Sequence, residues 1–432
     1  MAFIKPFAAT MYRHTADSDI SALTAPPYDV IGPELRARLI EGDNHNVVAI
    51  DLPEGPSDPT VPGNRYENAA ATWRNWRSAG ILVDDETEAF YVLEQTWEYA
   101  GKQVRRRAFV TAVELHAFSE GIVLPHERTM PRHVADRLDL TRTCSANLSQ
   151  VFCLFSDPAG ETDGMFDAAV RGEVVLSATD ADGVVSRVWA IRDAGTIAAL
   201  QAFMTEKQLF IADGHHRYTT ALAYRDERRA ADAAAGTEHI GRPDYDFTMM
   251  ALVNMDDPDL IVLPTHRQVR AETTFDADEF WQELARYFDI TTPPAGHPAA
   301  ALTAATTTSF LVKTADGTIK LATLRADIDV AEAIPGDASI AWKRLDVTVL
   351  QELILGPLFG IIPGEMSTLE RLTFVKDAHE ALKVENADVA FIMNSTRMEQ
   401  LREVALGGET MPQKSTYFYP KLLSGLFFRS MA

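Results

Sequence analysis

One stretch of the chain joins an apolar run almost directly to a helix pattern. Residues 208–213 read QLFIAD, an apolar run of strand length that ends in an aspartate. Residues 216–236 follow after a glycine and a histidine, and their apolar residues recur at helical spacing until Gly236 ends the pattern. This arrangement predicts a strand that turns sharply into a helix, which is a unit of mixed α/β domains.

The rest of the chain alternates hairpins with strand–helix units. Residues 89–115 alternate apolar and polar residues on both sides of Ala100-Gly101, which predicts a β-hairpin. Residues 310–324 predict a second hairpin around Asp316-Gly317. Residues 63–82 predict a helix, and residues 46–53, NVVAIDLP, predict a strand. Together these elements predict an α+β (mixed α/β) fold.

The length predicts more than one domain. A chain of 432 residues exceeds the size at which one hydrophobic core usually keeps growing. We expect three segments, with boundaries at residues 1–160, 161–292 and 293–432. The third begins with residues 293–309, PPAGHPAAALTAATTTS, which fit either a linker or an alanine-rich helix.

The charge restricts the partners. A formal net charge of −22 disfavours nucleic acids and anionic membranes, because most of the surface would repel them, although a local basic pocket can still bind a small anion. The only cysteines, Cys144 and Cys153, fit a reducing compartment. Without a signal-peptide pattern or an apolar run of about 18 residues, we expect a cytoplasmic protein. The oligomeric state is not determined by the sequence.

The junction after residues 208–213 carries the strongest chemical signal, IADGHHRY. Gly214 allows the backbone to approach a ligand closely, and the helix start offers unpaired N–H groups to an anion. Arg217 can donate two hydrogen bonds to a phosphate, and His215 and His216 can donate as well. Asp213 could hold Mg²⁺ or orient a histidine. The structural alternative is that Asp213 caps the helix and the histidines bind backbone carbonyls.

Residues 124–129, LPHERT, place three ionisable residues in a loop that follows an apolar run. Glu127 could act as a general base towards a hydroxyl group, because a carboxylate beside the cations His126 and Arg128 stays ionised. The alternative is a cluster of surface ion pairs. Asp136 and Arg137, further along, are expected to belong to an ionic network.

Three further motifs offer binding residues. LPTHR supplies His266 and Arg267 after an apolar strand, and MPQKSTYFYPK supplies Lys414, all three of which we predict to contact a phosphate or nucleotide. APPYDVI forms a rigid turn in which Tyr28 and Asp29 could line a substrate pocket. No Walker loop, nucleophile elbow or dinucleotide-binding fingerprint occurs in the chain.

Taken together, APPYDVI, LPHERT, IADGHHRYTTAL, LPTHR and MPQKSTYFYPK resemble the domain of unknown function 1015 family, in order and over residues 3–428. The ADGHHR corner is also similar to the Asp-Gly-His-x-Arg corner of the ParB/sulfiredoxin-like superfamily, which includes free serine kinases. This second resemblance implies a ParB-like core around the corner, a phosphate site at residues 213–217 and a link to serine metabolism. The sulfiredoxin cysteine has no counterpart beside the corner.

These features lead to a functional hypothesis with open alternatives. The first is a phosphotransferase that uses ATP or ADP with Mg²⁺ to phosphorylate a small hydroxy amino acid, free serine above all. Glu127, His215 and His216 would be its catalytic residues. A phosphatase acting on a metabolite such as phosphoserine and a non-catalytic nucleotide-binding regulator are the alternatives. His215→Ala and Arg217→Ala are expected to abolish phosphate binding and leave the thermal melt nearly unchanged.

Overall fold

The computed structural model describes residues 2–15, 18–294, 296, 298–365, 368 and 370–431. Its internal contacts divide the chain into two compact units. Unit 1 contains residues 1–125, 129–260 and 420–432, and unit 2 contains residues 126–128 and 261–419. The three predicted segments stay a prediction, because a division by contacts does not measure which parts fold independently.

Unit 1 is built on a mixed sheet with strand order β3-β10-β11-β5-β6-β13-β9-β12-β7, and β1 pairs with β6. Strands β9 and β13 are parallel, whereas β12 is antiparallel to β9. Two small sheets join β2 to β4 and β22 to β8. The strands of unit 1 are β1 Ile4–Lys5, β2 Thr10–Tyr12, β3 Ser18–Asp19, β4 Leu82–Asp84, β5 Phe90–Tyr99, β6 Lys102–Glu114, β7 Val123–Leu124, β8 Ala146–Asn147, β9 Val151–Phe155, β10 Leu176–Thr179, β11 Val185–Ile191, β12 Leu209–Asp213, β13 Phe247–Asn254 and β22 Arg429–Ser430.

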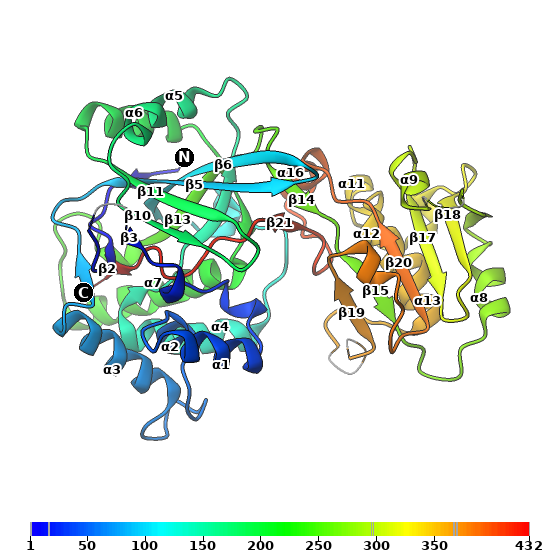
Figure 1. Ribbon diagram of the computed structural model, residues 1–432, viewed down its shortest axis with the longest axis horizontal. Coiled ribbons are helices and arrows are strands. Elements are labelled where there is room, and N and C mark those ends of the chain that lie inside the picture. The colour runs from blue at the N-terminus through cyan, green and yellow to red at the C-terminus, as the bar shows by residue number, and fades with distance from the viewer. Residues whose placement is uncertain are drawn as a thin grey trace. The chain divides into compact units, whose positions relative to one another are not determined.

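Helices cover both faces of this sheet. Figure 1 shows α5 and α6 on one side and α7, with α4 and α1–α3 beyond it, on the other. The core between the layers includes Phe166 of α5, Leu200 of α6 and Tyr218 of α7, all buried against the strands. The helices of unit 1 are α1 Pro33–Gly42, α2 Val48–Asp51, α3 Arg65–Ser78, α4 Pro131–Cys144, α5 Glu161–Val170, α6 Ala194–Met204 and α7 His215–Ala235.

Unit 2 contains an antiparallel sheet with strand order β16-β18-β17-β20-β15-β19, and β14 pairs separately with β21. Phe280, Phe359 and Phe391 pack together in its core, with ring centroids 5.9–6.3 Å apart. Its strands are β14 Ile261–Leu263, β15 His266–Val269, β16 Phe288–Thr291, β17 Ser309–Thr314, β18 Ile319–Leu324, β19 Leu372–Val375, β20 Val389–Met393 and β21 Tyr417–Tyr419. Its helices are α8 Ala277–Leu284, α9 Pro298–Thr303, α10 Val330–Ala333, α11 Ile340–Lys343, α12 Asp346–Leu350, the π-helix Gln351–Leu355, α13 Gly356–Phe359, α15 Ala378–Ala381 and α16 Met398–Leu406.

The predicted mixed α/β fold class is confirmed by this architecture. Both hairpins are present, as β5–β6 and β17–β18. Part of the stretch 293–309 forms helix α9, whereas residues 295 and 297 lie outside the described residues. The likeness to a ParB-like core stays a prediction.

The strand predicted at residues 46–53 is wrong, because this segment forms helix α2. The Asn46 side chain explains the helix start: its amide oxygen accepts a hydrogen bond from the N–H of Val48 at 3.0 Å. Its amide nitrogen donates to the carbonyls of Ala22 and Thr24. A short apolar run fits a buried helix as well as a strand, and here the polar residue before it selects the helix.

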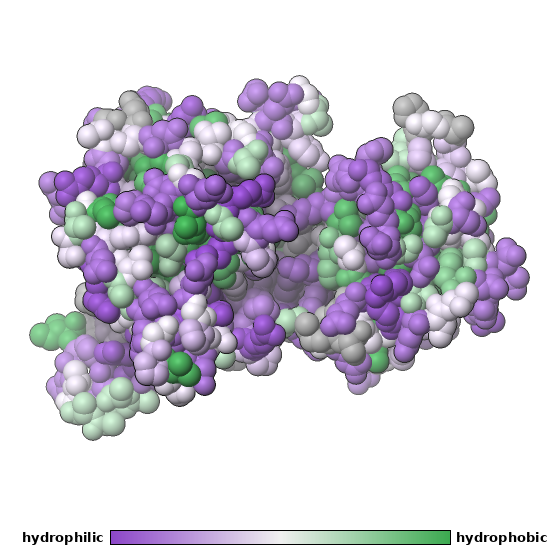
Figure 2. Space-filling model, turned by 60° about the horizontal axis from the view of Figure 1, so that its bottom comes forward, coloured by the Kyte–Doolittle hydropathy of each residue, from purple (hydrophilic) through white to green (hydrophobic). Residues whose placement is uncertain are grey.

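The surface in view is mostly polar. Figure 2 shows hydrophilic residues over most of the face in view, with only small, separate hydrophobic patches. Among the helices that the structure describes, none is long and apolar enough to cross a membrane.

Candidate functional site

The predicted strand-to-helix corner is present in unit 1. Strand β12 ends at Asp213 and helix α7 begins at His215, with Gly214 between them in a left-handed conformation (φ 93°). The N-cap residue of α7 is Gly214, which has no side chain to cap the helix. A Cβ at Gly214 would lie 2.9 Å from Arg217 Nε, so glycine is required both for the backbone angle and for the space.

Asp213 lies between two cations. Lys421 Nζ donates to one carboxylate oxygen at 2.5 Å, and Arg217 Nη2 donates to the other at 2.6 Å. Burial would raise the pKa of Asp213, but the charges of Lys421 and Arg217 outweigh it and lower the pKa. Asp213 is therefore an ionised carboxylate that fixes two cations at the corner.

This geometry does not fit a resident magnesium ion at Asp213, which the sequence predicted as a metal ligand. Both carboxylate oxygens already accept hydrogen bonds from cations. No group of three or more His, Cys, Asp or Glu side chains suited to a metal occurs within the described ranges. The metal role of Asp213 gains no support, and the alternative that Asp213 orients its neighbours fits better.

Arg217 has a structural role that the sequence did not predict. Besides Asp213, it binds the backbone carbonyl of Gln150, at the start of strand β9. Its side chain is only 13% exposed. Replacing Arg217 by alanine would therefore leave Asp213 and a buried carbonyl short of a donor, so we no longer expect an unchanged thermal melt.

The two histidines of the corner lie in different surroundings. His216 Nε2 accepts a hydrogen bond from the backbone N–H of Met130 at 3.0 Å, and its ring centroid lies 5.1 Å from that of His133. With Nε2 acting as an acceptor, Nδ1 is the ring nitrogen of His216 that carries the proton. His215 is buried and lies close enough to Asp213 for its charge to lower the pKa of that carboxyl group.

Tyr28 lies near the corner, as the sequence predicted for a pocket residue, although its role is untested. The Arg137 guanidinium lies over the Tyr28 ring, 4.4 Å from the centroid. Burial raises the pKa of Tyr28 to about 12, against the opposing charges of Arg137 and Arg217. Asp29, the next residue, is exposed.

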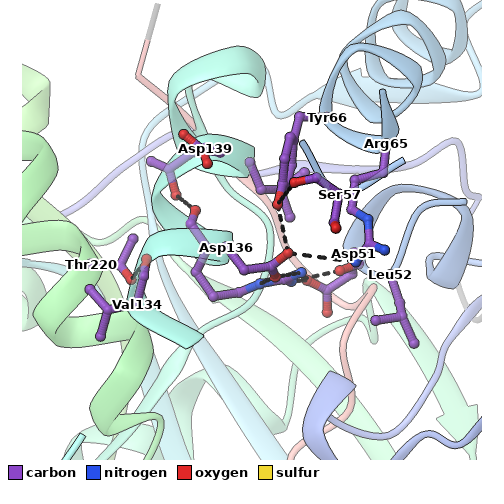
Figure 3. Close-up of polar contacts among 12 residues, drawn as sticks. Asp51, Leu52, Ser57, Arg65, Tyr66, Val134, Asp136, Asp139 and Thr220 are labelled. Atoms are coloured by element: carbon purple, nitrogen blue, oxygen red, sulfur yellow. Dashed lines mark hydrogen bonds and ion pairs between the residues drawn. The ribbon is translucent and has the colours of Figure 1, made fainter. Parts of the chain in front are cut away.

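The buried Arg137 is held by an ionic network that includes Asp136, as expected from the sequence. Its guanidinium donates to Asp136 Oδ2 at 2.8 Å and to the backbone carbonyl of Asp51 at 2.6 Å. Tyr66 donates its hydroxyl to the other oxygen of Asp136 at 2.9 Å. Figure 3 shows Asp51, Asp136 and Tyr66 converging from α2, α4 and α3. This network fixes Arg137, and with it Tyr28, beside the corner.

A small cavity of about 50 Å³ lies between α7 and α4, next to Arg137 and Arg217. Arg217 and Tyr224 line it from α7, and Arg137 and Thr141 from α4. Because one water needs about 10–15 Å³ of such space, the cavity has room for a few waters or a very small polar ligand.

The three ionisable residues of PHERT, residues 126–128, belong to unit 2. The His126 backbone carbonyl accepts from Met411 N–H at 2.7 Å, and Glu127 bridges Met411 in a parallel pairing. His126 Nε2 lies 2.9 Å from Thr416 Oγ1, and the Arg128 Nε donates to the Thr410 hydroxyl at 3.3 Å. Main-chain pairing thus places Glu127 beside the loop that carries Lys414.

His266, the histidine of the LPTHR motif, lies in the interior of unit 2. His266 is buried, and its Nδ1 accepts from Met393 N–H at 3.2 Å. Burial, helped by the charge of Arg267, lowers the pKa of His266 to about 4, so the ring is neutral at pH 7. A neutral, buried imidazole is a poor phosphate ligand, and the role predicted for His266 gains no support from this geometry.

Arg267 is also buried, and it donates to the backbone carbonyls of Thr265, Gln413 and Lys414. It therefore fixes the loop that presents Lys414, which is exposed and has φ 57°. The predicted site residues thus form two sets, one within each unit.

Sequence reasoning missed Lys421, the closest partner of Asp213. Lys421 ends the motif MPQKSTYFYPK, but it is separated from Asp213 by 208 positions, and no local pattern links them. Arg106 fixes the same segment, because its Nη2 donates to the carbonyl of Pro420 at 2.6 Å. The position of a lysine two residues after three aromatic residues was the only available signal.

Several solved structures are similar to the chain at low identity. A mutant free serine kinase in complex with ADP has a TM-score of 0.32 and 12% identity over 69% of this chain and 84% of that one. SbnI from Staphylococcus aureus, truncated at its C-terminus, has a TM-score of 0.34 and 10% identity over 73% and 85%. A conserved hypothetical protein from Pyrococcus furiosus has a TM-score of 0.31 and 13% identity over 70% and 89%.

No curated protein matches the sequence at a significant level. A family model, by contrast, matches residues 4–348, which is most of the chain and includes the APPYDVI, PHERT, DGHHR and PTHR motifs. The predicted family is thereby confirmed: the chain belongs to the protein family of unknown function DUF1015.

Proposed function

We propose that the protein is a phosphotransferase that moves a phosphoryl group from a nucleotide to a small hydroxy amino acid, with free serine as the first candidate. The observation that carries the proposal is the corner at residues 213–217. There a long helix begins directly behind a glycine, next to Lys421 and Arg217. Such a site suits a phosphate group.

The start of α7 would offer donors to the phosphate. The first N–H groups of α7 point out of the helix start, where the helix dipole favours negative charge. In a chain with a net charge of −22, this local gathering of cations would direct an anion to one place. Phosphoryl transfer needs chiefly such positioning and charge stabilisation.

The acceptor would have to be small. The cavity between α7 and α4 has a volume of about 50 Å³, and Arg137 and Arg217 line it. A carboxylate of an amino acid is the kind of group that two guanidinium groups bind. Magnesium would enter with the nucleotide as part of the substrate, since Asp213 does not offer a free carboxylate.

The chemical step would transfer the terminal phosphoryl group of the nucleotide. The acceptor hydroxyl oxygen forms a bond to phosphorus while the bond from phosphorus to the leaving nucleotide oxygen breaks. The hydroxyl proton would pass to Glu127, as inferred from the ionisable PHERT sequence. His126, Arg128, His266, Arg267 and Lys414 remain proposed nucleotide contacts. Arg128 and Lys414 are the two of them that are exposed.

A turnover assay tests the proposal. Purified protein is incubated with serine, Mg²⁺ and either ATP or ADP, and the products are followed by phosphorus NMR. A new phosphoserine signal supports phosphotransfer. Its absence with both nucleotides, in protein that binds them, contradicts it. Release of inorganic phosphate from added phosphoserine would indicate the phosphatase instead, and nucleotide binding without turnover would indicate the regulator.

A further inference from the structure

Unit 2 contains a second, mainly apolar cavity, which is lined by Arg267, one of the proposed nucleotide contacts. Its volume is about 30 Å³. The walls come from Val347, Leu355, Ile361, Leu372 and Phe374, which leaves few polar groups in contact with a ligand. Because one water needs about 10–15 Å³ of such space, the cavity holds roughly two waters or a ligand of a few heavy atoms.

Arg267 also lines this cavity. Arg267 is only 4% exposed, and its charged group lies over the Phe374 ring, 5.1 Å from the centroid. Its hydrogen-bond acceptors are the backbone carbonyls of Thr265, Gln413 and Lys414, all of them neutral. A charge this deeply buried is costly when only neutral groups surround it.

No carboxylate within the described ranges forms an ion pair with Arg267. The charge of Glu127 acts on it from beyond ion-pair distance and raises its pKa, but burial is the larger effect and lowers the pKa to about 10. The cavity therefore presents a buried cation whose opposite charge is incomplete. A bound anion would complete it.

The backbone around the cavity is also irregular. Gln351 and Leu355 line it from the two ends of the π-helix Gln351–Leu355, which interrupts the helical run after α12. Single turns of π-helix are rare and are often found at functional sites. Gln351 donates its side-chain amide to the carbonyl of Ile361 at 2.9 Å, which closes the far wall.

We propose that this cavity is a binding site for a small aliphatic monocarboxylate, with Arg267 receiving the carboxylate and the apolar walls receiving a short alkyl chain. A zwitterionic amino acid fits less well, because no acidic residue of the described ranges lines the cavity to receive its ammonium group. A phosphate fits less well, because most of its oxygens would face apolar walls. The site shares Arg267 with the proposed nucleotide contacts, but binding of a monocarboxylate does not require phosphotransfer.

Propionate is the probe for this site. Its binding to the whole protein is measured by isothermal titration calorimetry, and the thermal melt is compared in sodium propionate and in sodium chloride at equal ionic strength. We expect saturable binding and a melt shifted upwards by propionate, because a ligand that binds only the folded state stabilises it. Serine and inorganic phosphate are titrated in parallel and are expected not to compete with propionate.

Two variants and one control decide whether Arg267 is responsible. Arg267→Gln removes the charge and Leu372→Phe fills the cavity while keeping the guanidinium, so each should weaken propionate binding about tenfold or more. Arg371→Gln is the matched control, because Arg371 also donates to backbone carbonyls but does not line the cavity. It should bind propionate as the wild type does.

The proposal is overturned if the wild type does not bind propionate, if both variants bind it unchanged, or if phosphate displaces it. If Arg267→Gln fails to fold, Leu372→Phe alone gives the answer, since it leaves the buried cation and its carbonyl contacts in place. None of these measurements uses a nucleotide or serine. A failure here is therefore distinct from a failure of the phosphotransfer proposal.

Discussion

Replacing Asp213 by asparagine separates the two roles considered for this residue. The substitution keeps the shape of the side chain and removes its charge. In the structure, Lys421 and Arg217 would both lose their carboxylate partner, while the Arg217 bond to the Gln150 carbonyl would remain. If Asp213 instead held a metal ion, the main loss would be in metal-dependent nucleotide binding.

The structure sets the size of the effect. Removing one partner of a buried ion pair costs about 3–5 kcal/mol of unfolding free energy. The three side chains are 13–16% exposed, so the lower end of that range applies, and we expect about 3 kcal/mol. Asp139→Asn is the control, because Asp139 forms a more exposed pair with Arg142 and should cost at most about 1 kcal/mol.

The assay is urea unfolding at several pH values, followed by circular dichroism. The folded-state pKa of Asp213 is below its ordinary value, so its contribution is complete above about pH 4 and is lost as the pH falls through the lower folded value. Asp213→Asn should lack this component. ADP affinity in Mg²⁺ should not fall, because a negative charge near the phosphate is removed. An unchanged unfolding free energy, or loss of Mg²⁺-dependent ADP binding, would refute the structural role.

Three further predictions concern residues away from the phosphate corner. His266→Gln should lessen the loss of stability as the pH falls from about 6.5 to 4. The wild-type imidazole has a folded pKa of about 4 and therefore takes up a proton when the chain unfolds in this range. The resulting loss of unfolding free energy in the wild type is roughly 2–3 kcal/mol, which urea unfolding across that pH range measures. Tyr66→Phe removes the hydrogen bond to Asp136 and should lower the unfolding free energy by about 1–2 kcal/mol, with ADP affinity changed little. Glu127→Gln should reduce the rate of phosphoserine formation by roughly 10²–10⁴-fold and leave ADP affinity unchanged; an unaltered rate would remove Glu127 from the catalytic step.

Local patterns predicted most of the elements that position the corner. The hairpin β5–β6 follows from the alternation around Ala100-Gly101, and the β12–α7 junction follows from an apolar run, a glycine and a helical period. The segment that became α2 could not be assigned in this way, because the contact that decides it joins the Asn46 side chain to carbonyls more than twenty positions away.

The candidate site could be predicted only in part, for the same physical reason. The sequence identified the residues of the corner, but the charge on Asp213 is balanced by Lys421, which lies 208 positions away. The sequence likewise predicted that His266 and Arg267 contact a phosphate or nucleotide. Strand β15 buries both of them, and burial changes the pKa of each. Long-range pairing and burial are properties of the folded chain, which local motifs do not record.

The central claim is that a nucleotide phosphate occupies the start of α7, and ADP affinity in two glycine variants tests it most directly. Gly214→Ala places a methyl group at the corner, 2.9 Å from Arg217 Nε, where the phosphate would approach. Gly160→Ala introduces similar backbone strain at the start of α5, where φ is 67° and nothing lies within 4 Å of the new Cβ. By isothermal titration calorimetry of folded protein, we predict that Gly214→Ala weakens ADP binding about tenfold or more, whereas Gly160→Ala binds ADP like the wild type. Equal affinities in all three proteins, or no ADP binding by the wild type, would contradict the account.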